Sequence, residues 1–431
     1  MSAERELLCG WGRTPASAAS VVRPGSAAEL AKAGRDAGAR GVVARGLGRS
    51  YGDAAQNAGG LVVDATGVRG VLDFDRSAGV VRVLAGTSIE DVLRVVVPAG
   101  WFVPVTPGTR FVTIGGAIAA DIHGKNHHAD GTSCAHVGSM VLASPDGTTR
   151  TLTPDGTPEE FWATCGGMGL TGTIVEATFA LRPIETSRLL VDTDRVSDLD
   201  DLLARLREGQ RRYRYSVAWI DLLARGRRLG RSVLTQGDFA PLDALPPGRR
   251  ASALEFAPRR PLPAPHAPDG LLNRFTISAF NELWFRRAPA RRRDELQSIT
   301  TFFHPLDMAE GWNRLYGGRG FLQWQVVVPF GEEEVLRECV EALAEAGSPS
   351  FLAVLKTLGA ADPAPLSFPM PGWTLALDVP AGSVGVAELL DRLDRLVVDA
   401  GGRQYLAKDA RCRWDLVRRM YPRLHEWQAV G

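Results

Sequence analysis

Three glycine clusters constrain this chain more than any other feature of its sequence. They are "RGLGRSYGD" at 45–53, "PGTRFVTIGGAIAADIHG" at 107–124 and "GGMGLTG" at 166–172. Glycine lets a backbone turn sharply and bring its N–H groups close to a phosphate. The first cluster departs from the dinucleotide fingerprint G-x-G-x-x-G, because its third glycine, Gly52, comes one residue late and a polar segment follows. It predicts a phosphate-binding loop of another kind, lying between two strands.

Length and composition are typical of a globular protein. The 431 residues exceed what one core usually holds, so two domains are expected. A formal net charge of +1 gives no overall attraction to nucleic acid, and no such partner is expected. The N-terminus lacks the apolar core of a signal peptide, no apolar run is long enough to span a bilayer, and the five cysteines include no C-x-x-C pair. These features favour a cytoplasmic location.

Apolar periodicity predicts an α+β fold rather than a repeated βαβ array. We expect hairpins over 70–86 and 139–154, and helices over 27–38, over 87–100 with Thr87 or Ser88 as the N-cap, and after Thr113. Composition changes after Pro183, and residues 184–400 alternate strands with amphipathic helices. This pattern predicts a second sheet covered by helices. Residues 240–270, rich in Pro, Ala and Arg, predict a long mobile loop.

The glycine clusters have two interpretations. A single cluster is often only a tight turn, but three in one region would supply many N–H groups at close approach, which suits a pyrophosphate. Arg45 and Arg49 would add positive charge there, or would be solvated. A nucleotide-type cofactor is favoured over a set of structural turns.

The longer motifs resemble those of a known superfamily. "RGLGRSYGD", "PGTRFVTIGGAIAADIHGKNHH" and "FWATCGGMGLTG" resemble the FAD-binding domain of the vanillyl-alcohol-oxidase-like flavoproteins. Within it, "WNRLYGGRGFLQWQ", "APLSFPMPGW", "YLAKDAR" and "YPRLHEW" resemble the decaprenylphosphoryl-β-D-ribose 2′-oxidases. The resemblance covers nearly the whole chain. It implies a two-domain architecture, with an FAD-binding domain at 1–183, a substrate domain with an antiparallel sheet at 184–400, and a segment at 401–431 that returns to the flavin site.

The resemblance implies FAD as the cofactor. Many relatives tether flavin through a histidine in the first glycine loop, and residues 44–57 contain none, so non-covalent binding is expected. The FAD contacts implied by the matched motifs are Arg45, Gly46, Leu47, Gly48, Arg49, Ser50, Tyr51, Gly52, Gly108, Thr113, Ile114, Gly115, Gly116, Asp121, Ile122, His123, Ile174 and Tyr405.

The reaction implied is oxidation of the 2′-hydroxyl of a polyprenylphosphoryl-β-D-ribose, with the C2′ hydride passing to flavin. An NAD-dependent 2′-ketoreductase acting in series would complete epimerisation to the arabinose donor for cell-wall arabinan. Lys408 is the expected active-site cation that assists proton removal, and Tyr51 and His123 are the alternative bases. The substrate contacts implied are Lys125, Tyr316, Gln323, Gln325, Lys356 and Lys408.

Two other functions stay open at this point. One is a related flavin oxidase for a soluble sugar, polyol or nucleoside, and the other is a flavin-binding protein without turnover. The match also has departures. Ala376 stands where mycobacterial-type members carry a cysteine, and Thr374 replaces a larger polar residue, so pocket contacts differ. Family members usually continue past "HEWQAVG" by a helix-sized segment.

Two polar clusters have alternative interpretations. Three histidines, His123, His127 and His128, lie close together in the sequence. They do not suit a metal site, because Gly124 and Asn126 disfavour the helix that would align their side chains as ligands. No metal is expected, and polar packing or solvent exposure is favoured for His127 and His128. The arginine-rich pieces at 224–231 and 285–296 are usually solvated faces. Peripheral contact with an anionic membrane is the alternative.

Overall fold

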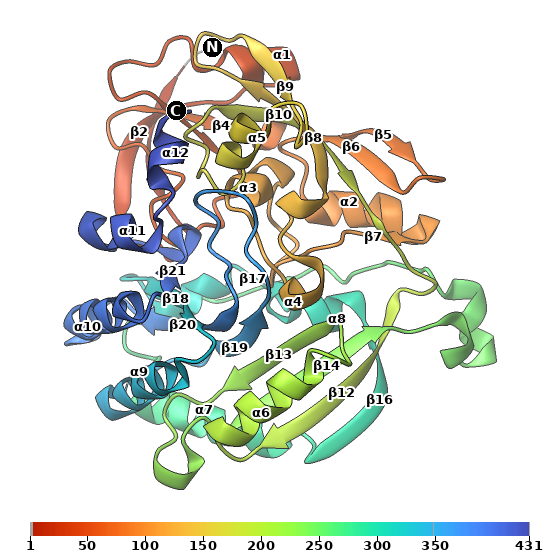
Figure 1. Cartoon of the computed structure of the whole chain (residues 1–431), viewed down its shortest axis with the longest axis vertical. Coiled ribbons are helices and arrows are strands. Elements are labelled where there is room, and N and C mark those ends of the chain that lie inside the picture. Colours follow the sequence, from red (N-terminus) through yellow and green to blue (C-terminus); the bar gives the residue numbers. More distant parts are fainter. Residues whose placement is uncertain (1–2, 348, 431) are drawn as a thin grey trace.

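The computed structural model describes residues 3–347 and 349–430. In this part of the chain the strands form sheets of four, five and eight strands and two short two-stranded pairs (Figure 1). The four- and five-stranded sheets use the N-terminal part of the chain, and the eight-stranded sheet uses strands from Arg188 to Gln404. The antiparallel pairings dominate, as an α+β fold requires.

The four-stranded sheet has the order β1-β2-β4-β3. Two of its three pairings, β2 with β4 and β3 with β4, are parallel. Helix α1 begins after the N-cap Ser26 and is shorter than the predicted helix over 27–38, since Gly34 disfavours continuation. The bounds are β1 (Glu4–Cys9), β2 (Ala16–Val22), α1 (Ala27–Lys32), β3 (Val42–Arg45) and β4 (Leu61–Asp64).

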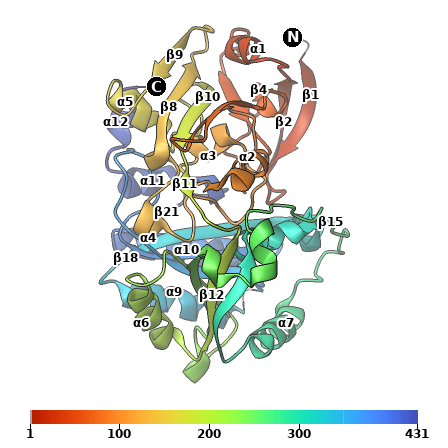
Figure 2. The same cartoon turned by 90° about the vertical axis from the view of Figure 1, so that its right-hand side faces the viewer.

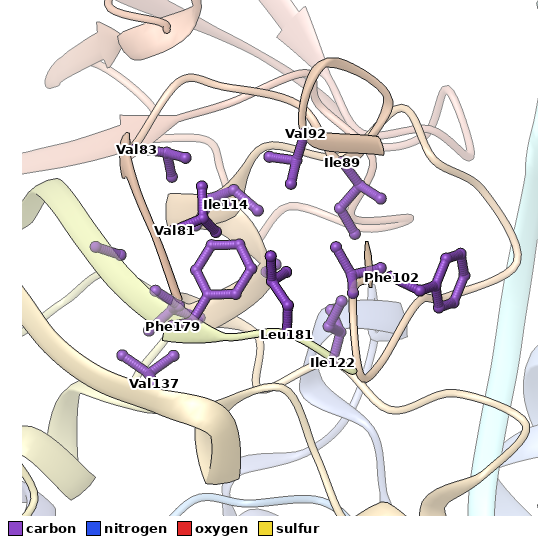
Figure 3. Close-up of a cluster of buried hydrophobic side chains, with 14 of the residues drawn as sticks. Val81, Val83, Ile89, Val92, Phe102, Ile114, Ile122, Val137, Phe179 and Leu181 are labelled. Atoms are coloured by element: carbon purple, nitrogen blue, oxygen red, sulfur yellow. The ribbon is translucent and has the colours of Figure 1, made fainter. Parts of the chain in front are cut away.

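The five-stranded sheet has the order β5-β6-β10-β8-β9 and contributes much of a hydrophobic core (Figure 3). Both predicted hairpins are confirmed, and Ser88 begins α2 with a capping box to Asp91. The core side chains come from this sheet, from α2, α3 and α5, and from β12, β13 and α8 of the C-terminal part. The bounds are β5 (Val71–Asp75), β6 (Val80–Leu84), α2 (Ile89–Val96), β7 (Trp101–Phe102), α3 (Ile114–Ala119), α4 (His127–Asp130), β8 (Val137–Ala143), β9 (Thr149–Leu152), α5 (Pro158–Thr164), β10 (Thr173–Ala180) and β11 (Arg182–Pro183).

The eight-stranded sheet has the order β16-β12-β14-β13-β19-β20-β18-β21. Helices α6, α9 and α10 pack their buried leucines and valines against one face, which confirms the predicted sheet covered by helices. The bounds are β12 (Arg188–Val196), α6 (Leu199–Gly209), β13 (Tyr215–Ile220), β14 (Ser232–Phe239), α7 (Arg274–Arg287), β16 (Arg291–Ser298), α8 (Ile299–Phe303), β18 (Phe321–Pro329), α9 (Glu333–Ala346), β19 (Ala353–Leu358), β20 (Gly372–Pro380), α10 (Val386–Asp399) and β21 (Arg403–Gln404).

The structure adds detail to three segments singled out in the sequence. In 285–296 most arginines are exposed, as expected of a solvated face, and residues from Arg291 form β16, the edge strand paired with β12. The piece 224–231 uses Arg231 in a buried ion pair with Asp221. Residues 240–270 contain two 3-10 turns and the short strand β15 (Leu262–Pro263), which pairs with β17 (Ala309–Glu310). This segment therefore has more regular structure than a loop prediction implies.

The C-terminal helices return toward the N-terminal part of the molecule, so both ends lie at the same side in Figure 1. Helices α11 (Trp414–Met420) and α12 (Leu424–Gln428) form an apolar cluster with Leu366. Trp427 lies against Gly167 in the third glycine cluster. Along the described chain we find no helix with the length and apolar character needed to cross a bilayer.

Candidate functional site

The first glycine loop follows β3 and packs against the N-terminus of α3. A Cβ on Gly46 would clash with the Thr113 hydroxyl, so only glycine allows this approach. Thr113 in turn caps α3 by accepting a hydrogen bond from the Gly116 N–H, at 3.2 Å. Gly48 has φ +63°, the left-handed conformation that glycine adopts at little cost. The loop therefore packs on the first turn of α3, whose Ile114, Gly115 and Gly116 N–H groups already donate to Thr87, Ala85 and Thr113.

Segments from both ends of the chain hold this loop in place. The Trp11 N–H donates to the Ser50 carbonyl at 2.7 Å, and the Tyr51 N–H donates to the Ala407 carbonyl at 3.1 Å. Gly52 packs so closely on the Asp409 carbonyl that a Cβ would overlap it. The loop conformation therefore depends on residues that are remote in sequence.

The two arginines of the loop have different surroundings. Arg45 donates to the carbonyls of Cys9, at 2.7 Å, and Ala55, at 3.0 Å, so its guanidinium supports the loop backbone. Arg49 stacks on Trp11, with its guanidinium carbon 3.8 Å from the ring centroid, and its buried Nε has no partner among the described residues. Burial lowers the pKa of both arginines. Arg49 is the one with a donor left for a ligand.

The second cluster lies beneath this loop. Gly115 donates its N–H to Ala85 at 2.9 Å, while Gly108 has open space around its Cα. Asp121 has φ +41°, and its carboxylate accepts from Ser367 on one oxygen and has no partner on the other. Burial raises the pKa of Asp121 to about 6. The remaining predicted cofactor residues are Leu47, Ile114, Ile122, Ile174 and Tyr405. The three isoleucine side chains are buried, and the Tyr405 hydroxyl donates to the Ala120 carbonyl at 2.6 Å.

A buried charge network fixes the segment next to Gly108. The Arg110 side chain, 1% exposed, pairs with Glu90 of α2 and, at 3.3 Å, with Asp307. Asp307 also accepts from the Thr109 hydroxyl at 2.6 Å. Sequence reasoning missed this network, since a charged residue carries no local signal that it will be buried with partners from two other segments.

The eight-stranded sheet presents a polar face toward this region. Opposite residues of paired strands point to the same face, and Gln323 pairs with Asp378, Gln325 with Ala376, and Lys356 with Thr374. The alternate residues Trp324, Leu375 and Leu377 pack against the helices instead. The spacing Gln-x-Gln thus marks a strand with one polar and one apolar face.

Three of the four lysines in the chain gather around this face, where the charge of Lys356 acts on both Lys125 and Lys408. Lys125, Lys356 and Lys408 are largely buried, while Lys32 is exposed on α1. Burial lowers the pKa of Lys125 and Lys408 to about 7 and that of Lys356 to about 8. Lys356 lies 3.5 Å from the Gly124 carbonyl, Lys125 donates to the Phe302 carbonyl, and the Lys408 Nζ lies 3.8 Å from the Tyr51 ring centroid. Amines gathered in this way repel one another unless an anion lies between them.

The histidines of the second cluster are buried and neutral. The His123 Nε2 lies 2.9 Å from the Gln325 amide nitrogen and accepts from it, so the ring proton lies on Nδ1, which has no partner among the described residues. Burial and nearby Lys356 lower the pKa of His123 well below its usual value. His127 accepts from the Gly359 N–H at 2.9 Å, and His128 bonds to the Tyr213 carbonyl. Within residues 3–347 and 349–430, no cluster of metal-ligating side chains occurs.

Asp378 is a site residue that sequence reasoning missed. Its carboxylate is fully buried, accepts from the Gln323 amide at 2.5 Å, and accepts from the Tyr316 hydroxyl at 3.3 Å. Burial raises the pKa of Asp378 to about 7, and the positive charge of Lys408 opposes that rise. A signal did exist, because Asp378 has the same strand parity as Thr374 and Ala376 and is the charged residue of an apolar strand.

Comparison with known proteins identifies the cofactor and the family. A model of an FAD binding domain matches residues 18–153, which include the first two glycine clusters. A decaprenylphosphoryl-beta-D-ribose oxidase of Mycolicibacterium smegmatis is 43% identical over 97% of this chain and 92% of its own. The chain belongs to the decaprenylphosphoryl-ribose oxidase family. Members of this family, and therefore this protein, are FAD-dependent oxidoreductases.

Two other relatives are more distant. An uncharacterized protein in the mprA 5′ region of Streptomyces coelicolor is 40% identical over 80% of this chain and 94% of its own. A D-lactate dehydrogenase of Anaerostipes hadrus is 27% identical over 22% of this chain and 20% of its own. The first match covers most of this chain, whereas the second covers about a fifth of it.

Proposed function

We propose that this protein oxidises the 2′-hydroxyl of a polyprenylphosphoryl-β-D-ribose to the 2′-keto sugar, the first half of epimerisation to an arabinose donor for cell-wall arabinan. The observation that carries the proposal is the meeting of Lys125, Lys356 and Lys408 beside the glycine loop of an oxidase family member. Three buried amines favour a substrate with a phosphate over a neutral sugar. An NAD-dependent ketoreductase would consume the keto product.

The residues present fit non-covalent FAD. We assign the pyrophosphate to a backbone concavity of the glycine loop at Gly46 and Gly48, where the buried Arg49 Nε has no partner among the described residues. The unpartnered His123 Nδ1–H suits an acceptor on the flavin ring. Residues 44–57 offer no histidine for a covalent link. Bound FAD supplies the hydride acceptor, and we assign residues 1–183 and 184–400 to an FAD-binding and a substrate domain, with 401–431 completing the flavin site.

The three candidate bases differ in their readiness to accept a proton. The Tyr51 phenol is buried, and its pKa is raised well above 10, so it stays protonated near neutral pH. The His123 Nε2 already accepts from Gln325. The Lys408 amine, with its pKa lowered to about 7, is partly neutral at physiological pH and takes the hydroxyl proton. Lys125 and Lys356 hold the substrate phosphate, and Gln323, Gln325 and Tyr316 orient the sugar.

The test is anaerobic addition of a short-chain, water-soluble polyprenylphosphoryl ribose to the FAD-loaded protein. We expect the visible flavin absorbance to bleach, and to bleach more slowly when C2′ carries deuterium, because the carbon–hydrogen bond breaks in that step. Free ribose at the same concentration serves as the control. Bleaching by free sugars or nucleosides alone would favour the soluble-substrate oxidase, and no bleaching by any of them would favour a flavin-binding protein without turnover.

Asp378 should set the pH at which the Lys408 amine becomes neutral. The rate of flavin reduction is expected to rise with pH through about 7, where Lys408 loses its proton. The Asp378 charge raises the pKa of Lys408. In Asp378→Asn the rising limb of the pH–rate profile should therefore move to lower pH. Stopped-flow flavin reduction across the pH range measures it, and a limb that stays in place or moves to higher pH would contradict this role.

A further inference from the structure

Helix α7 carries its large apolar side chains toward water. Phe275 is 84% exposed and Leu283 is 66% exposed, while Ile277 and Asn281 are the positions that face the protein. Trp284 is half-exposed and stacks on Phe280, with ring centroids 6.1 Å apart. Figure 2 shows α7 at the edge of the molecule, beyond the eight-stranded sheet. This orientation is the reverse of an ordinary surface helix, which turns its apolar stripe inward.

Positive charge surrounds these side chains. Arg274 at the start of the helix, Arg286 and Arg287 at its end, and Arg291 beyond it are all exposed. The acid on the helix, Glu282, is neutralised by ion pairs with Arg231 and Arg286. Large apolar side chains flanked by arginines are the features of a helix that lies in the interface of an anionic membrane.

A continuous series of aromatic contacts joins α7 to the candidate site. Phe280 contacts Phe351, with centroids 5.9 Å apart, and Phe351 stacks on Tyr316 at 5.6 Å. Tyr316 stacks on Phe321 at 4.1 Å, and Phe321 meets Tyr51 beside Lys408 at 5.6 Å. These aromatic contacts therefore connect α7 through the protein interior to Tyr51, beside Lys408.

We propose that the outer face of α7, formed by Phe275, Phe280, Leu283 and Trp284 with its flanking arginines, docks the enzyme on an anionic phospholipid bilayer. The inference rests on the proposed function, since a polyprenyl substrate stays in the bilayer while its phosphoribose enters the pocket. The charge favours lipid over a second copy of the chain, because two α7 faces meeting would bring their arginines together.

The test uses the full FAD-loaded chain and vesicles of equimolar phosphatidylglycerol and phosphatidylcholine at low salt. We expect the wild type to sediment with these vesicles and to bind pure phosphatidylcholine vesicles much less. The Phe275→Glu/Leu283→Glu double variant should lose at least about tenfold in vesicle affinity. Leu7→Glu/Leu72→Glu is the matched control, because it adds the same charge at exposed leucines of β1 and β5. Flavin absorbance and melting temperature report whether each variant folds.

Each outcome bears on the proposal. Wild-type protein that ignores anionic vesicles, or an α7 double variant that binds as tightly as wild type, would overturn it. A dimer that the α7 substitutions dissociate, without vesicle binding, would assign the face to a second copy instead. Bleaching by the water-soluble substrate with no vesicle binding would defeat this inference and leave the proposed function standing. Vesicle binding without bleaching by any phosphoribose would defeat the proposed function alone.

Discussion

Lys408→Met is expected to slow flavin reduction by about 10²–10⁴-fold at neutral pH, the range that general-base catalysis contributes. Methionine has a similar length but cannot accept a proton. The Lys408 amine lies 3.8 Å from the Tyr51 ring centroid, and burial lowers its pKa to about 7. Neither Tyr51 nor His123 offers a free basic atom in its place. Anaerobic stopped-flow absorbance measures the reduction rate directly.

The matched control is Lys32→Met, which changes the exposed lysine of α1 and should reduce at the wild-type rate. Both variants should retain FAD and show the wild-type visible spectrum. If Lys408→Met reduced its flavin at the wild-type rate, the proton would have to go to another group. Loss of FAD from Lys408→Met would instead indicate that the amine holds the cofactor.

Gly52→Ala is expected to lower FAD affinity by about 5- to 150-fold, because overpacking a rigid site costs about 1–3 kcal/mol. The new Cβ would overlap the Asp409 carbonyl, which is backbone and cannot rotate away. Either the glycine loop or the 407–409 turn must move, and both flank the proposed pyrophosphate concavity. Titration of the apoprotein with FAD, followed by flavin fluorescence, gives the affinity.

Gly38→Ala provides the control for this substitution. Gly38 has open space around its Cα and no left-handed φ, so an added methyl meets nothing. It should bind FAD as the wild type does. Equal FAD affinity in Gly52→Ala and Gly38→Ala would show that the loop does not need its close approach to Asp409.

Local signals in the sequence predicted much of the fold. The turn at Asp146-Gly147 and the capping box of Ser88 depend on residues a few positions apart, and both are present in the structure. The strands predicted within 184–400 include β18, whose alternating residues separate its polar face from its apolar face. The family motif located Lys408, whose role still awaits the experiments above.

Features set by distant contacts could not be predicted in this way. Asp378 becomes a site residue only because β18 pairs beside β20 and Tyr316 comes from another segment. Arg45 bonds to the carbonyls of Cys9 and Ala55, and Cys9 is remote from it in sequence. The run around Arg291 forms an edge strand because β12 supplies a partner, while Arg291 itself stays exposed. Residue type indicates whether a side chain prefers water or the core, whereas contact partners from distant segments determine where the side chain lies.

The contact of Gly52 with Asp409 also has a consequence for biosynthesis. The glycine loop leaves the ribosome early, but the turn that packs against it, at Ala407 and Asp409, is translated near the end of the chain. Domains generally fold as units during synthesis, with N-terminal regions first. A nascent chain that has already formed its first two sheets would still lack one wall of the flavin site. Cofactor capture would therefore be a late, post-translational event for this protein.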